Sequence, residues 1–371
     1  MERVKILVTD VNTRKAFDLY NIFLKLGYDT ELCSNTSKLE RYLLSLIYTK
    51  KVKKCNFNEI ANSRYTYVFF PIEEKTILKF YDFIETSNPT NIKYLLPTKE
   101  NFNLVRNKKK FFEFCLKNNI PVPREYKIEE LLKFKKLPTK LIIKPHIGTG
   151  SVGIKFIDKY EELIKYKDLD YSKYIIQERI ENSVNVEGGF FLCKDGELIS
   201  FYSHKRLRTY PPSGGVSVFS KCTYNEEIKN IGEVLLKKLN WNGIAMIEFL
   251  YDEKSKTYKV IELNPRAWGS ILLAEFCNSG LIENYINLCL GKTPIKTNIK
   301  QNSYIRWIFP WDIILYINKK GKIKDFWKLN TERTCYINFT YSNSYRSSLF
   351  LIYNTLDLKK LKKLLLKLKK E

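Results

Sequence analysis

Histidine and methionine are scarce in this sequence, and its cysteines form no metal-binding pattern. The 371 residues include two histidines, two methionines and eight cysteines. No two cysteines stand in a Cys-x-x-Cys pair, so the ligand spacings typical of zinc sites are missing. A chain of this length with scattered cysteines does not need a disulfide framework. We therefore expect reduced thiols and a cytoplasmic protein.

Long apolar runs are also missing. The chain contains no stretch of about 18 apolar residues, the length that crosses a bilayer. The most apolar late segment, 304–317, is interrupted by Arg306, Pro310 and Asp312. No signal-peptide pattern opens the sequence. These observations predict a protein without a membrane span.

Acidic residues are outnumbered by basic ones. Lysine and arginine total 64 against 40 aspartates and glutamates, which gives a formal net charge of +24. A nucleic acid, an anionic membrane surface or an acidic substrate would each suit this charge. The lysines are spread along the chain, however, and the abundance of Lys, Asn, Ile, Tyr and Phe is what an AT-rich genome favours. We therefore expect no nucleic-acid partner. The amphipathic tail 356–371 could lie on a membrane, but packing on its own domain is the preferred interpretation.

Strands and helices alternate over the first 97 residues. β-branched and apolar runs at 4–9, 29–33, 66–70 and 92–96 predict strands, and the segments between them have helical periodicity. This alternation predicts an α/β domain with a doubly wound parallel sheet. From residue 188 the pattern changes to hairpins, so α+β units with antiparallel strands should follow.

The segment 243–270 predicts a β-hairpin with a cation site. Two strand-like runs, 244–251 and 257–264, flank a polar turn. If the turn centres near Ser255, Glu248 faces Glu262, and Asn264 points to the same side as Glu262. Opposed carboxylates repel, and a hard divalent ion such as Mg²⁺ would relieve the repulsion. Arg266 could hold an anion beside the metal. The alternative is a solvated hairpin with scattered charges.

A glycine-rich loop follows Lys144. Glycines at 148, 150 and 153 would let the backbone approach phosphates. The lysine precedes the glycines and a strand follows them, so the loop matches neither a Walker A motif nor a Rossmann turn. Between two antiparallel strands such a loop could close over a triphosphate, with Lys144 as a point charge. An ordinary glycine-rich hairpin is the alternative.

Taken together and in this order, these motifs resemble the ATP-grasp superfamily. The motifs are Lys144–Gly153, Ile176–Ile180, Glu248 and Glu262–Arg266, and they are most similar to the carbamoyl-phosphate-synthase-like branch of carboxylate–amine ligases. The resemblance covers residues 1–300. It implies an N-terminal pre-ATP-grasp domain (1–97), a small grasp subdomain with the lid loop (98–187) and a large grasp subdomain with the metal site (188–300). A C-terminal accessory module (301–371) would follow, and its role stays open.

The resemblance implies a nucleotide site. Lys108 would contact ATP, with Lys109 and Lys110 as alternatives, and Glu187 would hold the ribose, with Glu181 as a rival. The remaining nucleotide contacts that it implies are Lys144, the lid residues Gly148, Thr149, Gly150, Ser151, Val152 and Gly153, and the adenine hinge Gln177, Glu178, Arg179 and Ile180.

The resemblance also implies the reacting groups. Glu248, Glu262 and Asn264 would bind two Mg²⁺ ions, with Mn²⁺ as an alternative, and Arg266 would stabilise an acyl phosphate. Lys205 and Arg206 are placed to grip a γ-phosphate or an acidic substrate. Arg208 is a weaker candidate, and a basic surface strand is the alternative for this segment.

The implied activity is ATP-dependent and ADP-forming. A small-molecule carboxylate would be phosphorylated, and an amine would then displace phosphate to give an amide. Amino acids and peptides are candidate substrates, and a homodimer is compatible with the sequence. Two alternatives stay open: an ATP-binding protein of this fold without turnover, and an ATP-dependent carboxylase.

Overall fold

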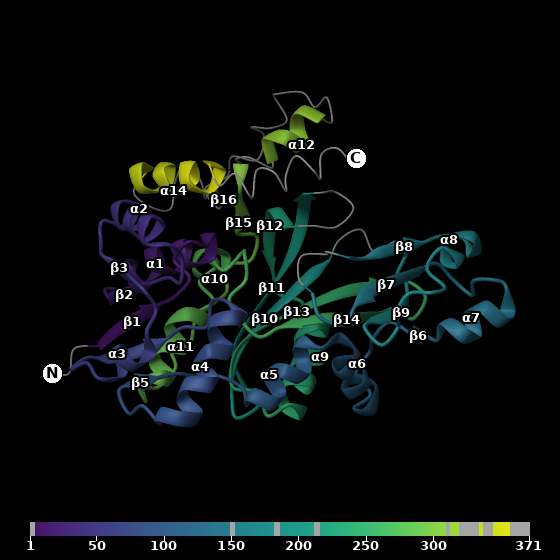
Figure 1. Cartoon of the computed structure of the whole chain (residues 1–371), viewed down its shortest axis with the longest axis horizontal. Helices are drawn as coiled ribbons and strands as arrows, with labels where there is room; N and C mark the ends of the chain where they lie inside the picture. The colour runs from purple at the N-terminus through teal and green to yellow at the C-terminus, as the bar shows by residue number, and fades with distance from the viewer. Residues whose placement is uncertain are drawn as a thin grey trace.

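Three β-sheets organise the chain in the computed structural model (Figure 1). The structure describes residues 4–148, 153–181, 186–210, 216–308, 312–318, 334–336 and 344–356. The N-terminal sheet lies at one end of the molecule and a small sheet at the other, with a large sheet between them. This arrangement places the predicted metal hairpin in the middle of the molecule.

The N-terminal sheet is parallel throughout and has the order β3-β2-β1-β4-β5. The predicted doubly wound α/β fold is therefore confirmed. The short strand β3 and helix α3 were not predicted, because runs of two and five residues carry too little periodicity. The elements are β1 (Val4–Val8), α1 (Arg14–Lys25), β2 (Asp29–Cys33), α2 (Lys38–Tyr48), β3 (Val52–Lys53), α3 (Phe57–Ala61), β4 (Thr66–Phe69), α4 (Glu74–Ser87) and β5 (Ile92–Lys93).

The small sheet is antiparallel, in the order β6-β9-β7-β8. Helices α7 and α8 pack on it, and two helices, α5 and α6, precede it. The elements are α5 (Lys99–Arg106), α6 (Lys108–Lys117), β6 (Glu125–Tyr126), α7 (Ile128–Phe134), β7 (Leu141–Pro145), β8 (Lys155–Ile157), α8 (Tyr160–Ile164) and β9 (Tyr174–Glu178).

The large sheet has the order β14-β13-β10-β11-β12-β15-β16 and is antiparallel except for its last pair. The described elements are β10 (Glu187–Lys194), β11 (Glu197–Tyr210), β12 (Val216–Thr223), α9 (Glu226–Lys238), β13 (Gly243–Asp252), β14 (Thr257–Asn264), α10 (Leu272–Phe276), α11 (Leu281–Cys289), β15 (Tyr304–Arg306), α12 (Ile313–Asn318), β16 (Thr334–Tyr336) and α14 (Ser344–Leu356).

The sequence predicts one helix over 270–290, and this prediction is wrong. Two helices, α10 and α11, occupy this segment. Between them Asn278 and Gly280 have positive φ angles of 56° and 65°. A left-handed backbone ends a helix, and glycine adopts it without the steric cost that a Cβ would bring.

Two of the hydrophobic cores show how the sheets are joined. One continuous core runs from the N-terminal sheet (Ile6, Val68) to the large sheet (Phe190, Tyr202), with Trp268 between them. A separate core lies between the small sheet and helices α7 and α8. No helix among the described residues is long and apolar enough to cross a membrane.

Gly243 starts β13 where the chain passes close to the N-terminal domain. Its φ angle is +91°, and a Cβ built on it would lie 2.2 Å from the carbonyl oxygen of Leu95. We expect Gly243→Ala to destabilise the protein by about 2–5 kcal/mol, because left-handed strain and a backbone clash add. Gly291→Ala is the matched control, since Gly291 has a φ of +68° and nothing within 4 Å. Urea unfolding measures the free energy of unfolding of both variants. Equal losses of stability would contradict a clash between a Cβ at position 243 and the Leu95 carbonyl in the first variant.

Candidate active site

The predicted carboxylate pair is present on the β13–β14 hairpin. Glu248 and Glu262 are direct partners in the antiparallel ladder, and Asn264 lies two residues beyond Glu262 on β14. All three side chains therefore point to the same face of the large sheet. The prediction that Glu248 faces Glu262 is confirmed.

This pairing depends on a β-bulge that the sequence did not reveal. At the turn, Asp252 pairs with Thr257, one residue short of the register that a turn centred on Ser255 gives. The register shifts by one immediately after Glu248, where Ile261 is the extra residue of β14. Because side chains alternate along a strand, the bulge determines which residues of β14 point to the same face of the sheet as Glu248.

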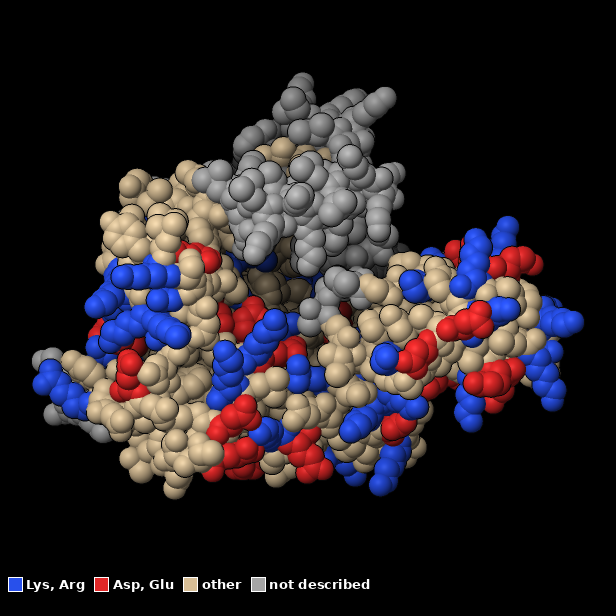
Figure 2. All heavy atoms as spheres, viewed as in Figure 1, with Lys and Arg blue, Asp and Glu red and all other residues tan. Residues whose placement is uncertain are grey.

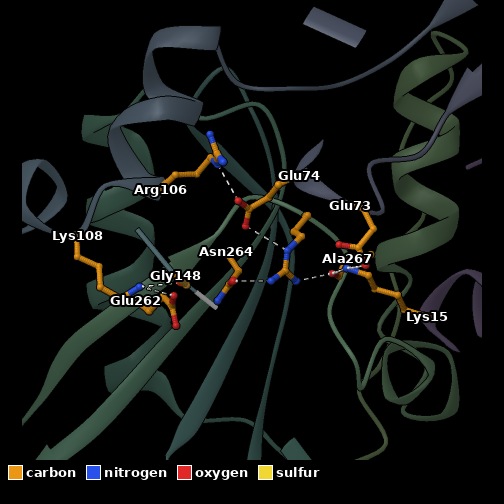
Figure 3. Close-up of polar contacts among 10 residues, drawn as sticks. Lys15, Glu73, Glu74, Arg106, Lys108, Gly148, Glu262, Asn264 and Ala267 are labelled. Atoms are coloured by element: carbon orange, nitrogen blue, oxygen red, sulfur yellow. Dashed lines mark hydrogen bonds and ion pairs between the residues drawn. The ribbon is translucent and has the colours of Figure 1, made fainter. Parts of the chain in front are cut away.

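Each carboxylate of the pair has a cationic partner from elsewhere in the chain. Lys108 Nζ donates to Glu262 Oε1 at 3.0 Å and to the Gly148 carbonyl at 3.1 Å (Figure 3). Arg206 donates through Nη2 to Glu248 Oε1. The sequence suggested a pair with no cation between its members, but the fold brings two cations to it.

Helix α6 presents Lys108 to the site. Its N-cap is Asn107, whose side chain accepts a hydrogen bond from the Lys110 N–H at 3.2 Å. Asparagine and aspartate are equivalent at this position. The Lys108 N–H donates to the His146 carbonyl at 2.8 Å, which ties the start of α6 to the loop after β7. Of the three consecutive lysines, Lys108 is the one that reaches the carboxylate pair.

The donor set suits Mg²⁺. Glu248, Glu262 and Asn264 offer three oxygen ligands, and the described residues contain no group of three or more His, Cys, Asp or Glu side chains that could hold a metal ion by themselves. Mg²⁺ uses one or two carboxylates and completes its shell with water and substrate phosphates. Burial raises the pKa of Glu262, and the neighbouring Lys108 opposes this shift. A cation beside Glu262 therefore favours the charged form of this carboxylate.

Lys144 is buried on β7 beside the same cluster. Its ammonium lies 5.7 Å from the centre of the Phe112 ring. Burial and the nearby charge of Lys108 together lower its pKa to about 8, against the opposite effect of Glu262 and Glu248. A buried ammonium without an ion-pair partner among the described residues is well suited to bind a phosphate.

The hinge residues Gln177 and Glu178, at the end of β9, are engaged in structural contacts. Gln177 is fully buried and donates to the Pro123 carbonyl at 3.4 Å. Glu178 accepts hydrogen bonds from the Arg124 N–H at 2.9 Å and from Lys259 Nζ at 2.6 Å.

Arg179 and Ile180, the last two hinge residues, follow β9 and are partly exposed. Arg179 pairs with Asp158 at 2.9 Å, and Ile180 follows it at the end of the strand. The side chains of Glu178 and Arg179 are thus already occupied, so adenine recognition through the hinge backbone stays a prediction.

The two candidates for the ribose contact differ in their surroundings. Glu187 is buried at the start of β10 and accepts a hydrogen bond from the Tyr258 hydroxyl at 3.0 Å. Glu181 forms a more exposed ion pair with Lys140 at 2.7 Å. Glu187 pairs with Phe249 in the ladder and therefore lies on the opposite face of the large sheet from Glu248, so the ribose contact stays a prediction.

Lys205 and Arg206 point to opposite faces of the large sheet, because neighbouring strand residues alternate. Arg206 reaches Glu248 and has a side chain only 12% exposed. Lys205 is 46% exposed and lies 3.7 Å from Glu187. The structure therefore brings Arg206, and not Lys205, to the carboxylate pair.

Arg208 serves a different contact. Its guanidinium forms two hydrogen bonds with Asp312, at 2.7 and 2.9 Å, and lies 4.7 Å from the centre of the Phe219 ring. Arg306 pairs with the same aspartate. Arg208 thus joins β11 to the C-terminal module instead of facing Glu248.

Arg266 is held by three partners (Figure 3). It donates to Glu74 at 3.3 Å, to Asn264 at 3.1 Å and to the Ala267 carbonyl at 3.1 Å. Glu74, at the start of α4, also accepts a hydrogen bond from Arg106 at 2.7 Å. The sequence did not predict Glu74 or Arg106, because 192 residues separate Glu74 from Arg266.

A second ion pair extends the site into the N-terminal domain. Lys15 contacts Glu73 and the Ala267 carbonyl, each at 3.1 Å. Burial and the nearby Arg266 together lower the pKa of Lys15 to about 8, although Glu73 opposes the shift. Lys15 and Glu73 lie where the N-terminal domain meets the loop after β14, which contains Ala267 (Figure 3).

Figure 2 shows a hollow between the N-terminal domain and the large sheet, with acidic and basic side chains on its walls. The predicted lid residues Thr149, Gly150, Ser151 and Val152 and the loop 211–215 lie outside the described residues. Gly148 and Gly153, at the ends of the lid, are described, and Gly153 has a positive φ of 81°.

The comparisons with known proteins agree with this geometry. Residues 105–270 match the family model of an ATP-grasp domain. No curated protein sequence matches the chain.

Solved structures with the same fold are numerous. The biotin carboxylase domain of Hydrogenobacter thermophilus 2-oxoglutarate carboxylase, a dimer in complex with MgADP, ADP and bicarbonate, superposes with a TM-score of 0.62 at 15% identity, over 82% of this chain and 73% of that one. Biotin carboxylase from Campylobacter jejuni in complex with β-γ-ATP gives 0.62 at 16% identity, over 82% and 74%. N5-carboxyaminoimidazole synthetase from Staphylococcus aureus gives 0.61 at 12% identity, over 85% and 84%.

Proposed function

Because residues 105–270 match an ATP-grasp domain, we propose that the chain is an ATP-dependent, ADP-forming ligase that joins a carboxylate to an amine. The single observation that carries the proposal is the opposed pair Glu248 and Glu262, with Asn264 beside it and Arg266 at the end of the same strand. A carboxylate pair beside a set of buried cations is costly in an empty protein, and it suits a metal–triphosphate complex.

The nucleotide would lie between the small and large sheets. Lys108, Lys144 and Arg206 surround the carboxylate pair and would bind phosphate oxygens. Arg206 offers a further donor, because its Nε is buried and has no hydrogen-bond partner among the described residues. Mg²⁺ held by Glu248, Glu262 and Asn264, with Mn²⁺ as a substitute, would neutralise charge between the β- and γ-phosphates.

The first chemical step would be phosphoryl transfer. A carboxylate oxygen of the acid substrate forms a bond to the γ-phosphorus, and the bond from that phosphorus to the β–γ bridging oxygen breaks, which releases ADP. The product of this step is an acyl phosphate. Arg266 would bind its negative charge, since Glu74 and Asn264 already fix the direction of the guanidinium.

The second step would form the amide. The amine attacks the carbonyl carbon, the carbon–oxygen bond to phosphate breaks, and the amine loses a proton as inorganic phosphate leaves. The acid and the amine would enter through the hollow between the N-terminal domain and the large sheet, where Lys15 and Glu73 offer one charge of each sign. Proximity of the two reactants supplies much of the rate in such a reaction.

The test is ADP release with a panel of acids and amines. We expect one acid–amine pair to raise ADP release and to give an amide of the corresponding mass. If ATP binds tightly and no pair raises ADP release, the protein is an ATP-binding protein without turnover.

A carboxylase is the second candidate. It is favoured by the structural likeness to the biotin carboxylase domain of Hydrogenobacter thermophilus 2-oxoglutarate carboxylase, which was solved in complex with MgADP and bicarbonate. Labelled bicarbonate in place of the acid distinguishes it, because only a carboxylase would transfer the label to an acceptor in an ATP-dependent reaction.

The shifted pKa of Lys144 gives a pH prediction. With a pKa of about 8 in the empty protein, its ammonium is charged below this pH and neutral above it. Nucleotide binding should therefore weaken between pH 7 and pH 9, by up to about tenfold if one charge-assisted hydrogen bond is lost. Calorimetric titration with ADP measures this change. The arginine in Lys144→Arg stays charged over this range, so ADP affinity should depend less on pH in this variant. An equally steep pH dependence would show that Lys144 is not the titrating group.

A further inference from the structure

Helix α2 exposes apolar side chains on the surface of the N-terminal domain. Leu39, Tyr42, Leu43 and Leu46 are 70%, 62%, 44% and 53% exposed. Their spacing of three and four residues places them on one face of the helix. The opposite face supplies the core residues Leu44, Ile47 and Tyr48. We call the exposed set the apolar face of α2. Contiguous apolar patches of this kind mark interaction sites.

A basic hollow adjoins this face. It lies between α2 and the edge strand β3 and has a volume of about 670 Å³. Five cationic side chains line it, and Glu59 is the one acidic residue in its lining. The cationic residues are Lys38, Arg41, Lys51, Lys53 and Lys54. Tyr42 belongs to both the hollow and the apolar face.

Most of this charge is not neutralised within the protein. Lys53 pairs with Glu31 at 2.6 Å. Lys38, Lys51 and Lys54 are exposed and form no ion pair with any residue that the structure describes. Figure 2 shows basic side chains gathered over this edge of the N-terminal domain. The active-site hollow lies elsewhere, where the N-terminal domain meets the large sheet.

From this juxtaposition we propose that the α2–β3 edge binds the surface of a membrane that contains anionic phospholipids. The apolar face would enter the interface between headgroups and acyl chains, and the basic hollow would receive headgroup phosphates. This combination of leucines, a tyrosine and flanking lysines is what interfacial membrane binding requires. The inference does not depend on the proposed ligase activity.

Other partners suit the surface less well. A symmetric dimer through this face would bring each basic hollow against its own copy, and like charges across an interface oppose association. The lysines along edge strand β3 also discourage another chain from adding a strand there. A nucleic acid would use the lysines but leave the apolar face exposed.

Co-sedimentation with vesicles tests the proposal. The full chain should bind phosphatidylcholine vesicles that contain phosphatidylserine, bind pure phosphatidylcholine weakly, and dissociate at high salt. The triple variant Lys38→Gln, Lys51→Gln and Lys54→Gln should lose about 100-fold in affinity, since each lysine near an anionic surface contributes roughly a factor of five to ten. The triple variant Leu39→Gln, Leu43→Gln and Leu46→Gln should lose at least about tenfold.

A charge-matched variant is the control for general electrostatic attraction. Lys117, Lys194 and Lys238 are exposed and lie away from α2, so their replacement by glutamine should leave binding nearly unchanged. All variants alter exposed side chains, and circular dichroism with thermal unfolding checks that they fold.

Several outcomes would overturn the proposal. An equal loss in the control would show attraction by net charge alone. Binding that survives the leucine substitutions would exclude insertion of the apolar face. Displacement by millimolar glycerol phosphate would indicate a site for a small anion. A leucine-dependent dimer in sedimentation without lipid would identify a second copy of the chain as the occupant.

Discussion

Replacing Glu262 with glutamine is expected to abolish ADP formation and to leave the fold intact. The substitution removes one of the two carboxylates that oppose each other on β13 and β14. Turnover should fall at least about 100- to 1,000-fold, the usual loss when a group that neutralises charge in a transition state is removed. Glutamine still offers Lys108 an oxygen acceptor, so the free energy of unfolding should change by only about 1 kcal/mol. ADP release and thermal unfolding measure the two effects.

Glu253→Gln is the matched control in the same hairpin. Glu253 lies in the turn, exposed and paired with Lys256 at 3.0 Å, so its loss should leave turnover unchanged. A titration with Mn²⁺ and ADP adds a readout besides activity, because Glu262→Gln should weaken metal binding and Glu253→Gln should not. Normal turnover in Glu262→Gln would remove Glu262 from the proposed metal site.

Arg266→Lys is expected to lose about 100- to 1,000-fold in kcat while nucleotide affinity stays within about threefold. All three guanidinium nitrogens of Arg266 have partners, namely Glu74, Asn264 and the Ala267 carbonyl. A lysine keeps the positive charge, but its single ammonium group cannot make the same three hydrogen bonds in the same directions. Single-turnover ADP formation and calorimetric ADP binding separate the two effects.

Arg106→Lys provides the contrast. Arg106 binds the same carboxylate, Glu74, at 2.7 Å, but it has no contact with Asn264 or the loop after β14 among its described partners. We expect its replacement to change kcat by less than about tenfold. If both arginine variants lost activity equally, Arg266 would act through Glu74 and the packing of α4, and the acyl phosphate would need another partner.

The hairpin that carries Glu248 and Glu262 could be predicted almost completely from the sequence. Alternating apolar residues, a polar turn and the spacing from Glu248 to Glu262 were enough to predict that the two face each other, since strand period and turn position determine register. The bulge at Ile261 has no recognisable pattern in the local sequence. The prediction and the structure therefore agree on the pair but reach it through different turn geometries.

The cations around the pair were harder to foresee. Lys108 and Arg206 approach the hairpin from 154 and 42 residues away, and Glu74 approaches Arg266 from 192 residues away. Only the packing of whole elements brings such residues together. The opposite directions of Lys205 and Arg206, in contrast, follow from strand alternation and could have been inferred once the segment was taken as a strand.

Helix α2 illustrates a different limit. Its sequence is apolar on two faces, because Leu39, Leu43 and Leu46 repeat at helical spacing just as Leu44, Ile47 and Tyr48 do. Periodicity shows that a helix forms, but it does not choose which of two apolar faces is buried. That choice is made by the sheet on which the helix packs.

The continuous core between the N-terminal sheet and the large sheet limits how the molecule can open. Sliding these two sheets apart would expose Phe190, Tyr202 and Trp268 to water, and exposing each large apolar side chain costs about 1.5–3 kcal/mol. The small sheet has its own core with α7 and α8 and shares only Ile175 of its strands with the core of the large sheet, so rotating it would expose less apolar surface. We therefore expect one rigid part that carries Glu248, Glu262 and Arg266, and one movable part, the small sheet, that carries Lys144. A substrate bound against the N-terminal domain would keep its position relative to Arg266 through each cycle of opening and closing.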